Sequence, residues 1–341
     1  MDYNSLDVLK EPHLVNLYEV PTGHILVVRG EGGLLECVSL GDYGKEANIK
    51  ADFLGLSQEI SEVKHQEMLP LSEKWVITIS TQYGCSMGCK FCSVPKVGKG
   101  LNCSYRDMLT QIQTALSLHP EIKKTQRLNL HFARMGEPSF NKEVLPVAIA
   151  GKQFTELGGG NFHPVVSTML PKNNQFLQRF VSRWVDFKNI ACAGEAGLQF
   201  SINSTSDAAR EDMFYGNSLD LSEIAKLIDS PPKGRKYTLN FAVAEYEIKG
   251  KDLKKYFNPD WYVVKLTPMH KTPEALEKGI KTPGNYTTFY PYKEIEKDLR
   301  NEGFDVITFI ASKEEDESGI TCGNAILAHP EKLFTFCKKV K

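Results

Sequence analysis

From about residue 73 onward, short apolar runs alternate along the chain with longer polar or amphipathic stretches. Six of these runs have the length and the β-branched or aromatic content of buried strands, and a polar or helical stretch follows each of them. We expect strands at 75–80, 128–133, 164–167, 198–202, 237–242 and 262–266. Strands that alternate with helices form a parallel sheet with right-handed crossovers. The pattern predicts an α/β fold, a partial (β/α)6 barrel that is open on one side.

The first part of the chain has a different pattern. Apolar runs at 24–29 and 34–38 are short and separated by glycine-rich turns, which is typical of a β-rich module. We interpret residues 1–72 as a small N-terminal accessory domain and residues 73–341 as the main domain. Further along, Ser104 and Asp107 have the spacing of a capping box at the start of a helix. The run 304–310 is expected to form an edge strand.

Three cysteines lie close together after the first predicted strand of the main domain. Cys85, Cys89 and Cys92 can hold three irons of a 4Fe-4S cluster, which would leave the fourth iron open to a cofactor such as S-adenosylmethionine (SAM). A zinc site is an alternative, but it needs a fourth ligand at similar spacing, and the nearest candidate, Cys103, is isolated in the sequence. A set of unligated structural thiols is the third interpretation.

Chemistry in parallel βα folds collects at the carboxyl ends of the strands, so the residues that follow each predicted strand are candidate ligands. Each has a simpler alternative: a Gly-Glu-Pro sequence is often only a turn, strand-end serines are often helix caps, and a histidine can be structural. The candidate cofactor-binding residues at these positions are Gly136, Glu137, Ser167, Ser201, Asn203 and His270.

Several of these segments together resemble the RlmN/Cfr family of radical-SAM enzymes, which methylate a ring carbon of adenine in RNA. The likeness runs from about residue 75 to about residue 328. The segments that carry it are Thr81-Gln82-Tyr83-Gly84-Cys85, Phe91-Cys92-Ser93, Arg134-Met135-Gly136-Glu137-Pro138 with Asn141, and Thr321-Cys322-Gly323.

The resemblance implies a barrel of radical-SAM type, a 4Fe-4S cluster on the three cysteines, and SAM bound by the strand-end residues. It implies that Glu137 contacts the amino group of the methionine part, and His270 stands where the family pattern usually has Asn. Cys322 would be methylated and would carry the one-carbon unit to C2 or C8 of an adenine. The expected partners are RNA or another adenine-containing substrate and an electron donor such as flavodoxin or ferredoxin.

One position departs from the family pattern. The family releases its protein–substrate adduct with a second cysteine, expected seven positions before the first cluster ligand, and that position is Thr78. Cys37 or Cys103 could substitute for it, and Glu67 is a weakly matched candidate for the general base. The alternative function is a radical-SAM enzyme of another reaction type, acting on a different nucleotide or small molecule. An iron–sulfur protein with a structural or electron-transfer role is a further alternative, which the strand-end motif and Cys322 disfavour.

Charge and composition limit the remaining possibilities. A formal net charge of −1 over 341 residues argues against a non-specific nucleic-acid binder coated with basic surface. Local basic groups at 233–236 and 249–255 could meet phosphates, although a solvated charged face is the simpler interpretation. The N-terminus has neither a basic leader nor an apolar signal segment, and no apolar run has the length of a membrane span. We expect a cytoplasmic monomer without membrane contact, whose eight cysteines stay reduced.

Overall fold

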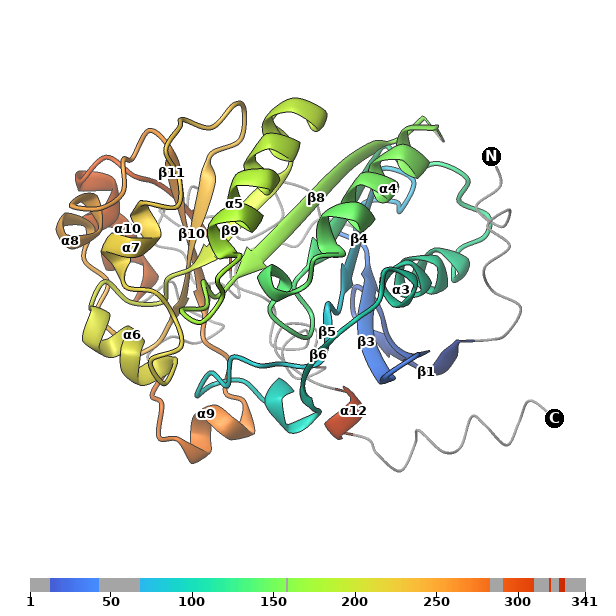
Figure 1. Cartoon of the computed structure of the whole chain (residues 1–341), viewed down its shortest axis with the longest axis horizontal. Helices are drawn as coiled ribbons and strands as arrows, with labels where there is room; N and C mark the ends of the chain where they lie inside the picture. Colours follow the sequence, from blue (N-terminus) through green and yellow to red (C-terminus); the bar gives the residue numbers. More distant parts are fainter. Residues whose placement is uncertain are drawn as a thin grey trace.

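The computed structural model describes residues 13–42, 68–157, 159–282, 291–309, 319 and 325–328 (Figure 1). Two residues singled out from the sequence, Glu67 and Cys322, lie outside the described residues. No helix among the described residues combines the length and the apolar character that crossing a membrane requires.

Ten strands form one continuous sheet in the order β1-β2-β3-β4-β7-β8-β9-β10-β11-β12. The first three strands, β1 (Leu14–Val20), β2 (Gly23–Gly30) and β3 (Gly33–Leu40), are antiparallel, and β3 pairs antiparallel with β4 (Lys74–Ile79). From β4 onward all neighbours are parallel. These strands are β7 (Arg127–Phe132), β8 (Asn161–Thr168), β9 (Gly197–Ser201), β10 (Tyr237–Val243), β11 (Tyr262–Pro268) and β12 (Asp305–Thr308).

The predicted α/β fold is confirmed, with each of the six expected strands present and β12 at the edge. The β-rich beginning of the chain consists of strands that hydrogen-bond directly to the edge of the parallel sheet, because β3 pairs with β4. The division of the chain at residue 72 remains a prediction. Strand β1 was not predicted from the sequence, because polar residues such as Asn16 and Glu19 interrupt its apolar pattern.

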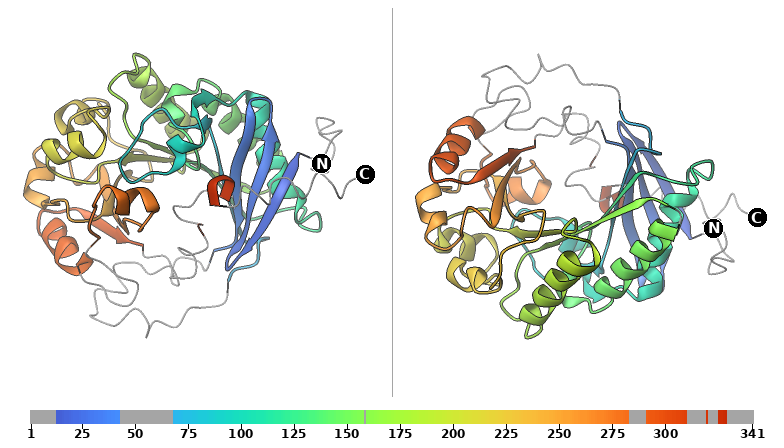
Figure 2. Two further views of the ribbon diagram at one scale, coloured as in Figure 1. Left: turned by 90° about the horizontal axis from the view of Figure 1, so that it is seen from below. Right: turned by 90° about the horizontal axis from the view of Figure 1, so that it is seen from above.

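The sheet is curved, and α3, α4 and α5 lie along its outer side (Figure 2). The longer helices are α3 (Tyr105–Ser117), α4 (Val144–Leu157), α5 (Leu177–Asp186) and α10 (Tyr292–Asn301). The short ones are α6 (Asp207–Met213), α7 (Leu221–Ala225), α8 (Gly250–Lys254), α9 (Pro273–Glu277) and α12 (Ala325–Ala328). The capping box is confirmed: the main-chain N–H of Asp107 donates to Ser104 Oγ over 3.1 Å, and that of Ser104 donates to Asp107 Oδ2 over 2.9 Å.

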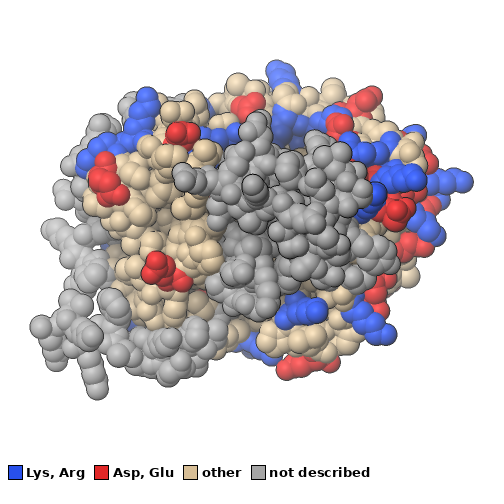
Figure 3. Space-filling model, turned by 180° about the vertical axis from the view of Figure 1, so that it is seen from behind, with Lys and Arg blue, Asp and Glu red and all other residues tan. Residues whose placement is uncertain are grey.

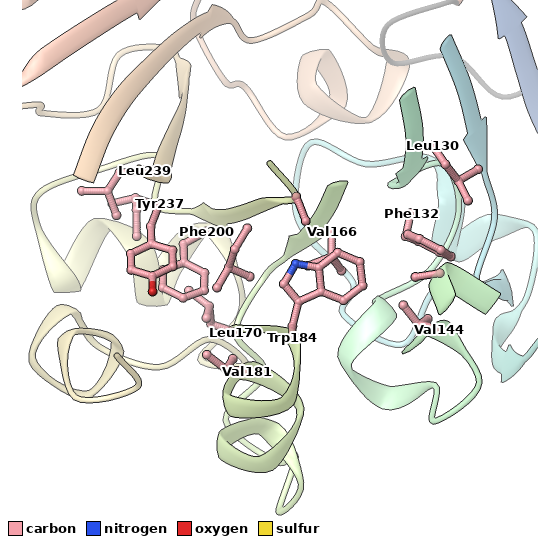
Figure 4. Close-up of a cluster of buried hydrophobic side chains, with 14 of the residues drawn as sticks. Leu130, Phe132, Val144, Val166, Leu170, Val181, Trp184, Phe200, Tyr237 and Leu239 are labelled. Carbon is pink, nitrogen blue, oxygen red and sulfur yellow. The ribbon is translucent and has the colours of Figure 1, made fainter. Parts of the chain in front are cut away.

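The core between α5 and the sheet is organised around Trp184 (Figure 4). Its ring meets the edge of Phe132 with centroids 5.9 Å apart, and its Nε1–H donates to the carbonyl of Gly197 over 3.0 Å. Both aromatic side chains are fully buried. Because a buried indole N–H needs an acceptor, this bond fixes α5 against the beginning of β9.

Candidate functional site

The cysteine loop is enclosed by a small two-stranded ribbon that was not predicted from the sequence. Strands β5 (Gln82–Gly84) and β6 (Lys99–Asn102) pair antiparallel on either side of it. Gly84 has φ +78°, and a Cβ there would lie 2.0 Å from the carbonyl oxygen of Gly98. Only glycine permits this close approach, so Gly84 allows the ribbon to close at the base of the loop.

Other parts of the barrel hold the loop by its carbonyl groups. Asn217 donates from Nδ2 to the carbonyl of Met87 over 3.2 Å, and Thr272 donates from Oγ1 to the carbonyl of Phe91 over 2.7 Å. Asn217 follows α6, whereas Thr272 follows β11. The loop after β4 is thus fixed to the carboxyl ends of strands on the other side of the sheet.

The three thiols share one apolar environment. Cys89 is buried in a cluster with residues such as Met213 and Met269, and Cys85 and Cys92 pack against that cluster. Burial, followed by the neighbouring Cys92 and Cys85, raises the pKa of Cys89 well above its usual range. Burial also raises the pKa of Cys85 to about 11, although the main-chain N–H of Met87 donates to its sulfur over 3.5 Å.

This donor set suits an iron–sulfur cluster. Among the described residues, no three Cys, His, Asp or Glu side chains converge as ligands of a single metal ion. The three sulfurs are nevertheless close enough to influence one another electrostatically. A cube of four irons needs thiolates spread around it, an N–H group directed at a ligand sulfur, and apolar side chains that exclude water. The loop offers the thiols and the N–H of Met87, and the cluster around it supplies the apolar side chains.

The predicted Gly136–Glu137 turn lies directly beside the ribbon. Gly136 has φ +95°, and a Cβ there would lie 2.5 Å from Cβ of Gln82. Gln82 in turn accepts the main-chain N–H of Glu137 at its Oε1 over 2.9 Å. Glycine is therefore required here by the approach of another strand, a reason that differs from the ligand contact proposed from the sequence.

The carboxylate of Glu137 is buried and accepts three hydrogen bonds. The donors are the N–H of Ser139 at 3.0 Å, Oγ1 of Thr168 at 2.7 Å and the N–H of Met169 at 2.6 Å. Burial raises the pKa of Glu137, and these bonds oppose that rise. The side chain of Ser139 is a further hydrogen-bond partner of this carboxylate, so a ligand amine would have to share its acceptor positions with these groups. The contact of Glu137 with SAM remains a prediction.

A cavity of about 370 Å³ opens beside the cysteine loop at the carboxyl ends of the strands. Phe91 from the loop forms part of its wall, together with Met169 and Met269, which also belong to or pack against the cluster around the thiols. The thiols and the cavity therefore share a wall. Four of the predicted site residues line this cavity: Ser167, Ser201, Asn203 and His270. Gly136 and Glu137 are not among its lining residues, and Glu137 reaches the wall through the N–H of Met169.

Asn203 lines the cavity and also has a structural role. Its backbone has φ +61°, a conformation that Asn tolerates better than most residues. Its Oδ1 accepts the main-chain N–H of Ala242 over 2.9 Å, which ties the end of β9 to β10. A ligand would meet the part of the amide that this bond leaves available.

A buried ion pair holds the C-terminal part of the chain against the sheet. Arg134 donates from Nε to Glu36 Oε1 over 2.6 Å, and its side chain and that of Glu36 are 6% and 0% exposed. Arg134 also donates from Nη2 to the carbonyl of Gly319 over 2.8 Å, while the N–H of Ala325 donates to Glu36 Oε2. We call Glu36 and Arg134 the clasp. It binds both flanks of the segment that contains Cys322.

Side chains on one face of β3 and β4 meet this C-terminal segment, and side chains on the other face meet the outer helices. Cys37 donates from Sγ toward the carbonyl of Gln111 in α3, so it faces the outer helices. Thr78 lies opposite Val38 in the register of β3 and β4, and Val38 packs with Ala325. Thr78 is therefore on the face that meets the C-terminal segment, whereas Cys37 is on the other face.

The sequence interpretation missed four polar residues that line the cavity from inside the strands: Gln199 of β9, Asn240 of β10, and Lys265 and Thr267 of β11. Strands of a parallel sheet covered on both faces normally read as continuous apolar runs. A lysine within the run Tyr262-Val-Val-Lys-Leu266 was therefore a detectable signal that one face of β11 lines a polar cavity.

Comparison with known proteins gives partial sequence matches and an extensive structural match. The chain is 35% identical over 101 residues to the dual-specificity RNA methyltransferase RlmN of Sulfurovum sp., covering 30% of this chain and 26% of that protein. It is 25% identical over 214 residues to RlmN of Campylobacter lari, covering 56% of this chain and 59% of that protein. The matches thus span between about a quarter and three fifths of these relatives. No family model matches the chain.

The structural match covers nearly the whole chain. A radical SAM methyltransferase from Sphaerobacter thermophilus superimposes with a TM-score of 0.60 and 18% sequence identity, over 95% of this chain and 87% of that one. At this identity the likeness concerns the fold, and the local sequence matches supply the relation to RlmN. The chain is a divergent relative of the RlmN proteins with the fold of a radical SAM methyltransferase.

Proposed function

We propose that the protein is a radical-SAM methyltransferase-like enzyme that modifies a ring carbon of an adenine-containing substrate. The observation that carries the proposal is the wall shared by the three thiols and the cavity, through Phe91, Met169 and Met269. A cofactor bound on an open iron beside this wall would project into the cavity. The partial matches to RlmN proteins and the methyltransferase fold support the same reaction class.

Each residue then has a defined task. Cys85, Cys89 and Cys92 would hold three irons, and the apolar side chains around them exclude water. Glu137 would accept a hydrogen bond from the amino group of SAM. The other predicted strand-end residues of the cavity would bind the rest of the cofactor or the substrate base, and these are Ser167, Ser201, Asn203 and His270. When bound, the cluster and SAM supply hydrogen-atom abstraction by one-electron cleavage of the sulfonium.

Cys322 would carry the one-carbon unit, and the clasp explains how it could be positioned. Gly319 and Ala325, which bind Arg134 and Glu36, each lie three residues from Cys322. Three residues of chain extend about 10 Å at most. Chain length alone therefore keeps Cys322 within reach of Arg134, which is two residues before the Gly136–Glu137 turn.

RNA is the first candidate substrate because the relatives are named RNA methyltransferases. Binding of a long RNA would be favoured by a continuous basic surface, and the described residues do not form one on the face shown in Figure 3. On the face in Figure 3, basic and acidic side chains are interspersed around residues that are not described. Three lysines of the predicted basic group each pair with an acid, as Lys249–Glu247, Lys254–Glu302 and Lys255–Asp252. These pairs favour the interpretation of that group as a solvated face.

Two products test the proposal. We expect the anaerobically reconstituted protein, given SAM and a reductant, to form 5′-deoxyadenosine and to gain the mass of one methyl group on the peptide that contains Cys322. Formation of 5′-deoxyadenosine requires a functional cluster, and the added methyl group identifies Cys322 as the thiol that carries it. A protein that binds iron and SAM but yields neither product would contradict the proposal and favour a structural or electron-transfer role.

The clasp can be tested separately from the chemistry. A single substitution leaves a buried unpaired charge, which costs about 3–5 kcal/mol, so we choose the neutral pair Glu36→Met with Arg134→Met, which removes both the acceptor for Ala325 and the donor to Gly319. Because the flanks of the segment lose their partners, we expect hydrogen exchange of Ala325 to accelerate about tenfold or more and Cys322 methylation to slow in parallel, with the cluster absorbance retained. The matched control is Lys254→Met, which breaks an exposed pair worth about 0–1 kcal/mol. Unchanged exchange at Ala325 would show that the clasp does not restrain the segment.

A further inference from the structure

The cavity has one cationic side chain that the proposed function does not use. Lys265 is the sole Lys or Arg among the described lining residues, which include no Asp or Glu. Its Nζ lies 5.7 Å from the ring centroid of Phe309, and within the described parts of the chain no acid pairs with it. An ammonium group that is half-buried without an anionic partner is destabilising unless a ligand neutralises it.

The surroundings of Lys265 increase the positive potential. Burial, followed by the charge of Arg235, lowers the pKa of Lys265 to about 8. The pKa of His131 is lowered to about 3 by burial and then by Lys265, Arg235, Lys74 and Arg127. His131 is thus neutral at pH 7, and four cations influence the same interior region. Clefts lined by charge of one sign concentrate ligands of the opposite sign.

Nearby acids offset the positive charge of two of these cations, Lys74 and Arg235. Lys74 forms an ion pair with Asp42 over 2.5 Å, and Glu195 partly offsets the positive field at Arg235. Lys265 has no such compensation among the described residues, and it is the member of this group that lines the cavity. The charge of Lys265, which no described acid offsets, is therefore placed where a ligand can reach it.

We propose that Lys265 forms an anion subsite inside the barrel that binds a phosphate group of the substrate. The inference rests on the proposed function, which supplies the adenine, and adds that the substrate is an adenine nucleotide whose phosphate enters the cavity.

Lys265 lies three residues before the end of β11, about 10 Å inside the edge where His270 is found. A cavity of about 370 Å³ is too small for two nucleotides, so beside the cofactor it would admit only part of the substrate, and the phosphate is the part that Lys265 would bind. A polynucleotide strand at the mouth would insert a base and leave its internal phosphates outside, so the position of Lys265 favours a mononucleotide or a terminal nucleotide.

Competitive labelling of the reconstituted holoprotein tests this subsite without turnover. Acetic anhydride at pH 8 labels lysines, and peptide mass spectrometry compares Lys265 with the control Lys142, whose side chain is 91% exposed. We expect AMP to reduce labelling of Lys265 about tenfold, inorganic phosphate to do so at higher concentration, and adenosine to protect much less, with Lys142 unchanged. A short single-stranded RNA with an internal adenosine is the second arm. Protection by this RNA but not by AMP would assign the phosphate to a polymer and overturn the mononucleotide preference.

A binding measurement complements the labelling. In Lys265→Met, which keeps the apolar stem and removes the charge, we expect AMP affinity to fall about tenfold while adenosine affinity stays within about twofold of the unsubstituted protein. Lys254→Met should change neither affinity. Protection by inorganic phosphate, together with no binding of AMP and no protection by the RNA, would support the anion subsite and overturn the adenine substrate of the proposed function. Equal binding of AMP and adenosine, together with no protection by phosphate, would overturn the subsite itself.

Discussion

Replacing Cys85, Cys89 and Cys92 together by Ala should abolish the charge-transfer absorbance of the reconstituted protein and reduce 5′-deoxyadenosine formation to background. The three thiols pack in or against one apolar cluster that offers no other sulfur ligand than methionine thioethers among its described members. Removing all three therefore leaves nothing to hold the irons. The measurement is iron stoichiometry, the absorbance spectrum and the yield of 5′-deoxyadenosine after reconstitution.

The matched control is Cys103→Ala, because Cys103 is the thiol nearest in sequence to the loop and would be the fourth ligand of a zinc site. Its side chain is 1% exposed and belongs to the main hydrophobic core. A 4Fe-4S cluster held by the three thiolates of the loop does not need this buried thiol as a ligand. We expect full cluster content in this variant. Full iron content in the triple variant would instead place the metal elsewhere in the chain.

The sequence predicted the repeating part of the fold because the signal there is local. Strands such as β4 have the apolar content and length of buried strands, and a polar or helical stretch follows each of them. The ribbon of β5 and β6 was missed because its strands have three and four residues, include glycines and depend on pairing across the cysteine loop. Short elements of this kind are stabilised by tertiary contacts more than by their own sequence pattern.

Some residues of the candidate site could likewise be predicted from local sequence, and others could not. Strand ends indicated Ser167, Ser201, Asn203 and His270, and the structure brings all four to one cavity. The clasp could not be predicted, because Glu36 and Arg134 are 98 residues apart and Gly319 is a further 185 residues along the chain. No local pattern connects them. The structure adds a reason for glycine at position 136, which is the close approach of Gln82, and the contact of Gly136 with a cofactor remains a prediction.

Changing Cys322 to Ala should leave the cluster intact but eliminate the modified product. Cys322 is absent from the ligand loop, and the clasp binds its flanks near the Gly136–Glu137 turn, so its proposed task is to carry the one-carbon unit. Absorbance and 5′-deoxyadenosine formation without substrate serve as controls for the cofactors. Normal turnover of the substrate by this variant would exclude a methyl carrier and favour the alternative reaction type.

The outcome for the unsubstituted enzyme depends on which group releases the adduct on Cys322. Cys37 faces α3, and burial is the main cause that raises the pKa of both Cys37 and Cys103. Buried, protonated thiols react slowly in disulfide exchange. Thr78 lies on the face that meets the C-terminal segment, but a hydroxyl cannot form a disulfide.

We therefore expect a covalent protein–substrate adduct to accumulate through Cys322, to be relieved by Thr78→Cys, and to be little affected by Cys103→Ser. Thr78 is half-buried in β4, so the exchange of a hydroxyl for a thiol with loss of one methyl group should leave the strand pairing unchanged. Intact-mass spectrometry during turnover measures the adduct directly. Rapid multiple turnover in a variant lacking Cys37 and Cys103, with Thr78 intact and no trapped species, would mean that the reaction never forms an adduct. In that case Cys322 would have another role, and the enzyme would belong to a different reaction type on the same fold.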